Sequence, residues 1–236
     1  MILAPSLELT FIHIHKTGGS SLERCIEPHL MWSDLILGSS DFGEKINEAF
    51  NQRFGLHKHS SVSDIESICG SKYVDEYYCF AFVRHPIDRV CSLYNFTASV
   101  VLGWAGQQGL SLHKLRQRMN EGTLPASLNW ATSQAFVTTD TFSGYIRSEH
   151  LWKDMGFQTQ ASRLRSRRDA TIRADAFRIE DQQAWQSRLS IKLGLSLTLT
   201  HDNKSRLRLV EAASLCKGDT EYLSNVFEED FHVFGY

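Results

Sequence analysis

Residues 7–22 read Leu-Glu-Leu-Thr-Phe-Ile-His-Ile-His-Lys-Thr-Gly-Gly-Ser-Ser-Leu, and this stretch decides the fold. Apolar residues alternate and then concentrate over residues 7–14, which predicts a buried strand. The Gly18-Gly19 pair interrupts the pattern, after which apolar residues recur at helical spacing from Leu22 to Leu30. Ser20 and Glu23 have the spacing of a helix-capping box. The sequence therefore predicts a strand, a tight loop and a helix.

A second strand, turn and helix follow further along the chain. Residues 77–83 (Tyr-Tyr-Cys-Phe-Ala-Phe-Val) are aromatic and apolar throughout, as in a central strand covered on both faces. The run ends at Arg84-His85-Pro86. Because proline disfavours helix before it but suits the first helical turn, we expect a helix to begin at Pro86.

The remaining periodicities predict further elements. Helices are expected at 41–54, 62–68, 111–120, 127–137, 182–193 and 219–231, and short strands at 176–179 and 195–200. Strands that alternate with helices indicate the α/β class, with a mainly parallel central sheet flanked by helices on both faces. A chain of 236 residues suits one domain, 1–236.

Composition limits the classes of function. The chain has 25 basic and 27 acidic side chains, so the basic field of a typical nucleic-acid binder is missing. Its five cysteines form no CxxC pair, and we expect them to be reduced. Neither a signal peptide nor a stretch of about 20 apolar residues is evident. We therefore predict a cytoplasmic protein without a membrane or nucleic-acid partner, and its oligomeric state is not readable.

The loop after the first strand has the features of a phosphate-binding site. Backbone N–H groups at the start of a helix attract anions, glycines allow close approach, and lysine and hydroxyl side chains add donors. The candidate residues are Lys16, Thr17, Gly18, Gly19, Ser20 and Ser21. The loop is not a Walker A motif, because that motif places its glycines before the lysine.

A second candidate anion site follows the second strand. Arg84 stands at the strand end, and Arg89 and Ser92 share one face of the next helix. An arginine fork and a serine hydroxyl suit phosphate oxygens, although Arg89 could instead form a structural ion pair. Two anion sites at neighbouring strand ends suit a nucleoside with phosphates at both ends.

Both motifs resemble those of the family 2 sulfotransferases, the group related to heparan sulfate 2-O-sulfotransferases and many bacterial enzymes. Residues 11–22 resemble the 5′-phosphosulfate loop, and residues 80–94 match the 3′-phosphate motif R-x-P-x-x-R-x-x-S-x-Y at each fixed position. Weaker similarities are found at residues 177–180, at Asn203, Lys204 and Ser205, and at residues 230–236. One departure is His15, where the family usually has proline.

The resemblance implies a P-loop-NTPase-like sulfotransferase fold, 3′-phosphoadenosine 5′-phosphosulfate (PAPS) as donor and adenosine 3′,5′-bisphosphate (PAP) as product. It also implies that Asn203, Lys204 and Ser205 form a loop that closes near the nucleotide. In-line sulfuryl transfer needs stabilisation of the leaving oxygen, for which Lys16 is placed, and a base for the acceptor.

The segment Gly55 to Ser61 resembles the place where the family carries its catalytic histidine. His59 is the expected base, with His57 as its rival, and His57 and Lys58 are candidate acceptor contacts. Because the sequence lacks a metal-ligand spacing, we predict no metal. The basic run from Arg163 to Arg168 is either a lid over an anionic acceptor or a solvated segment.

The acceptor is the least determined part of the prediction. We expect a hydroxyl or amine of a small cytosolic compound, such as a natural product. The alternatives are carbohydrate O-sulfation with a saccharide acceptor, an ATP-dependent small-molecule kinase, and a catalytically silent nucleotide- or glycan-binding module.

Overall fold

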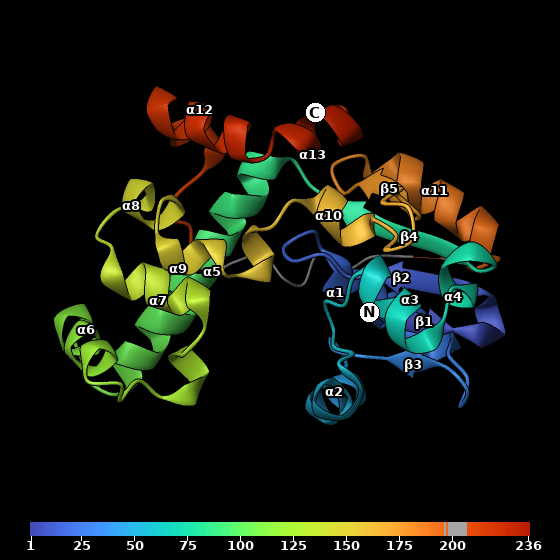
Figure 1. Cartoon of the computed structure of the whole chain (residues 1–236), viewed down its shortest axis with the longest axis horizontal. Helices are drawn as coiled ribbons and strands as arrows, with labels where there is room; N and C mark the ends of the chain where they lie inside the picture. Colours follow the sequence, from blue (N-terminus) through green and yellow to red (C-terminus); the bar gives the residue numbers. More distant parts are fainter. Residues whose placement is uncertain (196, 198–206) are drawn as a thin grey trace. The chain divides into compact units, whose positions relative to one another are not determined.

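The computed structural model describes residues 1–195, 197 and 207–236, and these form two compact units. The first unit comprises Met1–His85, Thr159–Asn203 and Glu229–Tyr236. The second unit comprises Pro86–Gln158 and Lys204–Glu228. Figure 1 labels the elements of both. The assignment of residues 1–236 to a single domain stays a prediction.

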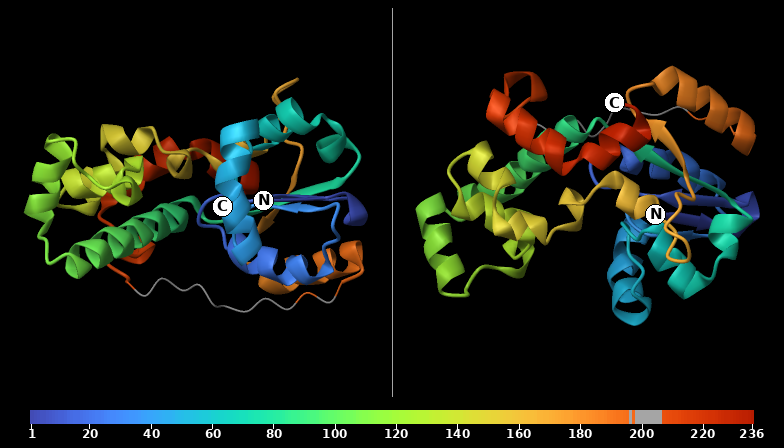
Figure 2. Two further views of the ribbon diagram at one scale, coloured as in Figure 1. Left: turned by 90° about the horizontal axis from the view of Figure 1, so that it is seen from below. Right: turned by 45° about the horizontal axis from the view of Figure 1, so that its top comes forward.

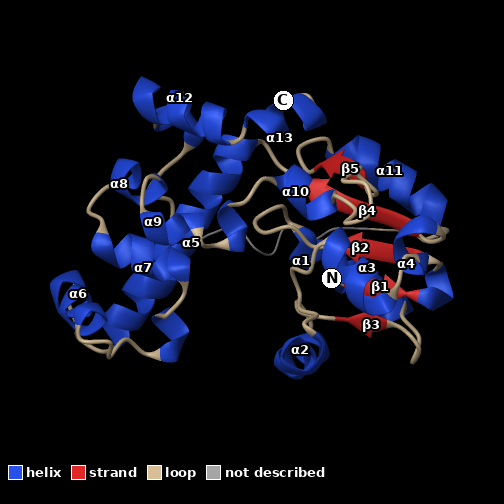
Figure 3. Cartoon of the chain, in the orientation of Figure 1, coloured by secondary structure: helices blue, strands red, loops and turns tan. Residues whose placement is uncertain are grey.

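The first unit contains a five-stranded sheet, shown in red in Figure 3. Its strands are β1 (Ile2–Ala4), β2 (Leu9–Ile12), β3 (Leu35–Ile36), β4 (Tyr78–Val83) and β5 (Asp175–Arg178), in the order β3-β1-β2-β4-β5. β2, β4 and β5 are parallel, whereas β1 pairs antiparallel with both β2 and β3.

The sheet is therefore mixed, and the prediction of a mainly parallel sheet is wrong for β1 and β3, which pair antiparallel. A 3₁₀ turn, η1 (Pro5–Leu7), and Glu8 are all that connect β1 to β2. A parallel pair needs a crossover of a dozen or more residues, so this short connection dictates an antiparallel hairpin.

Both faces of the sheet are covered, as the sequence predicts. In β4 the side chains of Cys79, Ala81 and Val83 enter one apolar cluster, and those of Phe80 and Phe82 enter the other. This alternation follows from the two-residue period of a strand. The first cluster is completed by residues of α2, α3 and α4, and the second by residues of α1 and α11.

The first unit has seven α-helices among its described residues, and those at 41–54 and 182–193 have the predicted bounds. The seven helices are α1 (Gly19–Ile26), α2 (Asp41–Phe54), α3 (Val62–Cys69), α4 (Lys72–Asp75), α10 (Gln160–Leu164), α11 (Gln182–Leu193) and α13 (Glu228–Phe234), with a 3₁₀ turn, η2 (Glu27–His29), after α1. The Ser40 and Ser61 hydroxyls cap α2 and α3, and Gly55 ends α2 at a φ of 72°. Serine caps and left-handed glycines satisfy backbone groups that a helix end leaves open.

The second unit is helical. It contains α5 (Pro86–Gln107), α6 (Leu112–Asn120), α7 (Ala131–Thr138), α8 (Phe142–Ile146), α9 (Glu149–Trp152) and α12 (Lys217–Val226), with 3₁₀ turns η3 (Ala126–Leu128), η4 (Met155–Phe157) and η5 (Ala212–Ser214). The left panel of Figure 2 shows α5, in green, along its length. Tyr94 of α5 packs against the rings of Phe136, Phe142 and Tyr145.

Most predicted elements are confirmed, including the start of α5 at Pro86. The helix predicted at 127–137 begins only at Ala131, after η3, and the one predicted at 219–231 is two helices that meet near Phe227. The strand predicted at 195–200 lies outside the described residues, apart from Leu195 and Leu197. No helix in the part of the chain that the structure describes has the length and apolarity to span a membrane.

Ser61 provides a test of the α3 cap. Its hydroxyl accepts from the Asp64 N–H, and the Asp64 carboxylate accepts from the Ser61 N–H at 2.7 Å. We expect Ser61→Ala to lower the free energy of unfolding by about 1 kcal/mol, measured by urea denaturation. Ser63→Ala, inside the same helix, is the matched control and should change stability by less than about 0.5 kcal/mol. Equal effects of the two substitutions would contradict the cap.

Candidate functional site

The loop between β2 and α1 and the end of β4 lie at the same edge of the sheet. β2 and β4 are parallel neighbours, with Ile12 opposite Ala81, so residues that follow both strands emerge side by side. The Arg84 guanidinium donates to the Lys16 carbonyl at 3.4 Å. The structure thus brings together the two cations that the sequence places at strand ends.

The loop backbone turns sharply before α1. Lys16 has a φ of 65° and Gly18 a φ of 82°, both in the left-handed region. Gly18 is the N-cap of α1 and contributes no side-chain hydrogen bond there. The Gly18 carbonyl accepts from the Ser21 N–H at 3.1 Å. The backbone N–H groups at this end of α1 belong to the helix terminus that attracts anions.

Gly19 is required because a histidine ring lies against it. A Cβ at Gly19 would lie 2.5 Å from Cδ2 and 2.7 Å from Nε2 of His13. His13 is 4% exposed, and its Nδ1 hydrogen bonds to Glu23 Oε1 at 2.8 Å. This buried pair holds His13 under the first turn of α1.

The predicted capping box of Ser20 and Glu23 is wrong. Because Gly18 is the N-cap, Ser20 is the second residue inside the helix and the spacing of the box is out of register. Glu23 instead points inward, is fully buried, and accepts hydrogen bonds from His13 and from the Met1 nitrogen. A buried carboxylate needs such partners, and here they also fix the loop.

The same contacts determine how this pair titrates. Burial by itself raises the pKa of Glu23, but the charges of His13 and the Met1 amino group, and the hydrogen bonds from both, lower it below its usual value. Burial lowers the pKa of His13, with Glu23 opposing that change. We infer that Glu23 is ionised near pH 7 and accepts the Nδ1–H of His13, which both the neutral and the charged ring can provide.

The loop hydroxyls have different environments. Thr17 is buried and its hydroxyl donates to the Ile14 carbonyl at 2.9 Å, so that group stabilises the loop. The Ser20 hydroxyl accepts from Ser39 at 2.9 Å. Ser20 and Ser21 are half-buried, and Gly18 is exposed.

Lys16 is half-buried beside a second cation. Burial, and then the charges of Arg84 and Lys58, lower the pKa of Lys16 to about 8. An anion placed against such a lysine strongly stabilises its charged form, because the anion offsets both the cost of burial and the repulsion by the other cations.

His59 is held with one ring nitrogen occupied. Its Nδ1 lies 2.8 Å from the His13 carbonyl oxygen, which can only accept, so Nδ1 carries the proton. Burial, followed by the charges of His15 and His13, lowers the pKa of His59 well below its usual value. The ring is therefore neutral near pH 7, and Nε2 holds the free electron pair of a base.

His57 has the opposite arrangement. Its Nδ1 accepts from the His59 backbone N–H at 3.1 Å, so the proton of its neutral ring is on Nε2. Lys58, the third residue predicted in this segment, pairs with Glu44 at 2.9 Å, and its methylene groups lie over Gly38.

Arg84 is held by a buried amide that the sequence analysis missed. Gln160 accepts from the Arg84 N–H at 2.9 Å and donates to the Arg84 carbonyl at 2.8 Å. Asp230 in turn accepts from the backbone N–H groups of Gln160 and Ala161, each at 2.9 Å. Gln160 and Asp230 are both fully buried. Their separation in sequence from Arg84 left no local pattern by which to find them.

Arg89 lies differently from the prediction that it binds the donor. Its side chain is 1% exposed, and its terminal nitrogens donate to the carbonyls of Gly156 and Gln158 at 2.7 Å each. It also packs over the Phe227 ring, 5.2 Å from the centroid. These contacts favour a structural role within the second unit, and we leave Arg89 out of the candidate site.

The basic run at 163–168 is anchored by acidic partners. Arg165 pairs with Glu229 at 2.5 Å, and Arg168 pairs with Glu66 at 2.9 Å and with Asp75 at 2.7 Å. Arg163 donates to the His59 carbonyl at 2.6 Å. These contacts fix the chain locally, while Arg167 and Arg168 stay exposed. A lid over an anionic acceptor stays a prediction.

The remaining predicted donor contacts lie either in the second unit or outside the described residues. Ser92 is half-buried on α5, in the second unit. Asn203, Lys204 and Ser205 lie outside the described residues. Among the residues that the structure describes, no three or more His, Cys, Asp or Glu side chains are grouped as metal ligands would be.

Comparison with known proteins gives one match. A family model described as the sulfotransferase family matches residues 1–125, which is more than half of the chain and includes both strand-end motifs. No curated protein and no solved structure matches the chain.

Gly19 provides a test of the contact beneath the loop. We expect Gly19→Ala to lower the free energy of unfolding by about 1–3 kcal/mol, because the new methyl group must displace the His13 ring. Gly103→Ala on α5 is the matched control: a Cβ there meets nothing within 4 Å, so stability should stay the same or rise by up to about 1 kcal/mol. Urea denaturation measures both, and a Gly19→Ala protein as stable as the wild type contradicts the contact.

Proposed function

Since this chain belongs to the sulfotransferase family, we propose that it transfers a sulfuryl group from PAPS to a hydroxyl or amine of a small acceptor. The observation that carries this proposal is the position of Lys16 beside Arg84 at the carboxyl ends of two parallel strands. Two adjacent cations of this kind suit a donor with separate phosphate groups.

The loop before α1 is the proposed site for the 5′-phosphosulfate. Backbone N–H groups from Thr17 to Ser21 would hold the phosphate at the start of α1. Of these, the Ser21 N–H also donates to the Gly18 carbonyl at 3.1 Å. The hydroxyls of Ser20 and Ser21 would add donors, whereas that of Thr17 is used within the loop.

Arg84 is the proposed contact for the 3′-phosphate, and Ser92 stays a prediction as a second donor. Gln160 hydrogen bonds to both the N–H and the carbonyl of Arg84, so the backbone that carries the guanidinium is held in place. A fixed fork loses less conformational entropy when it binds an anion. Asn203, Lys204 and Ser205 lie outside the described residues and stay predicted donor contacts.

Lys16 is the proposed stabiliser of the leaving group. As the bond between sulfur and the bridging oxygen of PAPS breaks, negative charge develops on that oxygen, and PAP departs with it. A cation already in place at that point stabilises the transition state without further reorganisation. The sulfuryl group passes to the acceptor oxygen or nitrogen in line with the departing oxygen.

His59 is the proposed base. Its Nε2 takes the proton that the acceptor loses as the new bond to sulfur forms, while Nδ1–H stays bonded to the His13 carbonyl. His57 is less suitable, because the Nε2 of its neutral ring carries a proton. The geometry thus favours His59 between the two histidines of this segment.

The acceptor is proposed from charge alone. A formal net charge of −2 does not provide the positive field that attracts a highly sulfated polysaccharide, so we favour a small molecule over a saccharide chain. The cytoplasmic location stays a prediction.

Calorimetric titration tests the donor. We expect PAP to bind and ATP, with or without Mg²⁺, to bind at least about 10-fold more weakly, because ATP carries no 3′-phosphate for Arg84. Lys16→Met and Arg84→Met should each weaken PAP binding by about 10- to 100-fold, since each removes a charge-assisted contact.

His59→Gln and Arg53→Met serve as controls in the same experiment. His59→Gln should leave PAP affinity within about threefold of wild type while abolishing PAP release from PAPS. Arg53 is exposed, and its replacement should change neither quantity. Preference for ATP over PAP would overturn the proposed donor, and full turnover in His59→Gln would overturn the proposed base.

The low pKa of Lys16 gives PAP binding a pH dependence. Lys16 is mostly neutral above about pH 9 and becomes charged as the pH falls through about 8. A bound anion favours the charged form, so affinity should rise by about 10-fold from about pH 9.5 to about pH 7. Calorimetry across this range should show no such rise for Lys16→Met, and a flat wild-type profile would contradict the role of Lys16.

A further inference from the structure

The ring of His15 lies on the ring of His59. Their centroids are 3.5 Å apart and their planes differ by 26°, so the two imidazoles are stacked. The ring of His13 meets His59 from another side, edge to face, with centroids 4.8 Å apart. All three residues belong to the first unit.

These contacts restrict the orientation of the His59 ring. The bond from Nδ1 to the His13 carbonyl fixes one edge of the ring, and the stack on His15 fixes its plane. The backbone is held as well, because Arg163 binds the His59 carbonyl and His57 accepts from the His59 N–H. With plane and edge both fixed, the direction of the Nε2 electron pair is fixed too.

We propose that His15 is a positioning residue for His59: its ring holds the plane of the base, so that Nε2 is the atom presented to the acceptor. This rests on the proposed function, in which His59 removes the acceptor's proton. His15 acts through His59 and is not itself assigned contact with donor or acceptor. A small displacement of a catalytic group lowers the reaction rate strongly, so a stacked ring that prevents such displacement supports catalysis.

The stack also bears on the charge of His59. Burial is the largest cause of its low pKa, and the next is the charge of His15, followed by those of His13 and the Met1 amino group. Arg163 adds a guanidinium at the His59 carbonyl.

Two further groups near His59 complete this environment. His57, in the same segment, is a third imidazole, and its own pKa is lowered by burial. Asp64 lies 3.6 Å from Arg163 and partly balances its charge. Because the cationic form of His15 disfavours a second cation beside it, removal of His15 should raise the pKa of His59. Protonation would then set in at a higher pH.

Histidine NMR tests this inference independently of any acceptor. In the ¹⁵N-labelled full chain, the His59 ring is identified by the loss of its signals in His59→Gln. We expect the wild-type ring to be the Nδ1–H tautomer and to stay neutral at pH 6. His15→Ala and His15→Phe should each raise the pH at which His59 titrates by at least about half a unit. A wild-type His59 ring found as the Nε2–H tautomer overturns the proposal, because Nε2 could then not take the acceptor's proton.

Kinetic measurements on the two His15 variants distinguish the effect of ring stacking from the effect of the His15 charge. PAP release from PAPS, with water as the acceptor, is measured against pH for both variants. His15→Ala loses both stack and charge and should lower kcat by about 10- to 100-fold with little change in the KM for PAPS. His15→Phe keeps an aromatic ring and should retain more of kcat than His15→Ala, with its acidic limb still moved to higher pH. Equal kcat in His15→Ala and wild type contradicts the positioning role.

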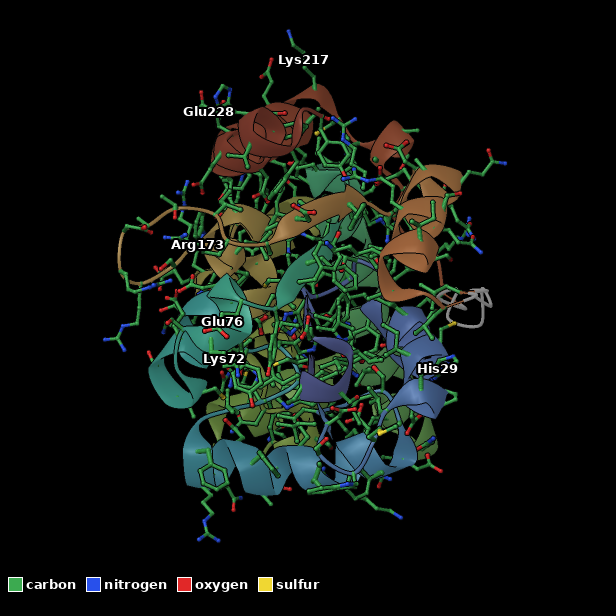
Figure 4. The ribbon with its side chains drawn as sticks, turned by 90° about the vertical axis from the view of Figure 1, so that its right-hand side faces the viewer. His29, Lys72, Glu76, Arg173, Lys217 and Glu228 are labelled. Carbon is green, nitrogen blue, oxygen red and sulfur yellow. The ribbon has the colours of Figure 1, made fainter. Side chains whose placement is uncertain are left out.

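His29→Phe is the matched control, because His29 lies exposed on η2, where Figure 4 labels it. It should leave both the NMR titration of His59 and PAP release as in wild type. Failure of the proposed function is recognised separately, since a His59→Gln protein with full turnover removes His59 from the reaction. The effect of His15 on the titration of His59 would still be measurable in that case.

Discussion

The parallel pairing of β2 with β4 is the constraint on which the candidate site depends. The register that sets Ile12 opposite Ala81 makes the chain leave both strands at one edge of the sheet. Lys16 and Arg84 then meet, although 68 residues separate them in the sequence. The antiparallel half of the sheet, imposed by the short link between β1 and β2, does not disturb this edge.

Buried polar pairs give that edge its detail. Glu23 and His13 support the loop before α1, and Gln160 with Asp230 supports the backbone of Arg84. A buried polar group without a partner is costly, so each of these pairs has a strongly preferred arrangement. Rigid supports of this kind allow cations that repel one another to stay side by side. Burial, and then the charges of Arg84 and Lys58, lower the pKa of Lys16.

Local patterns were reliable where the local backbone decides the outcome. The helix start at Pro86, the strand over the apolar run of β4 and the tight loop at Gly18-Gly19 are all predicted correctly from the sequence. The capping box was predicted wrongly because the Glu23 side chain has two possible partners: it could cap its own helix or bind His13.

The sequence by itself determined the α/β class, most of the helices, the two strand-end motifs and the resemblance to sulfotransferases, because these depend on periodicity and on short runs of residues. Only the tertiary structure decided the mixed sheet, the partners of Glu23 and of the basic run at 163–168, and the stack of His15 on His59. Those features join residues that are remote in sequence or that have equivalent local choices. Burial selects among such choices, and burial exists only once the chain has folded.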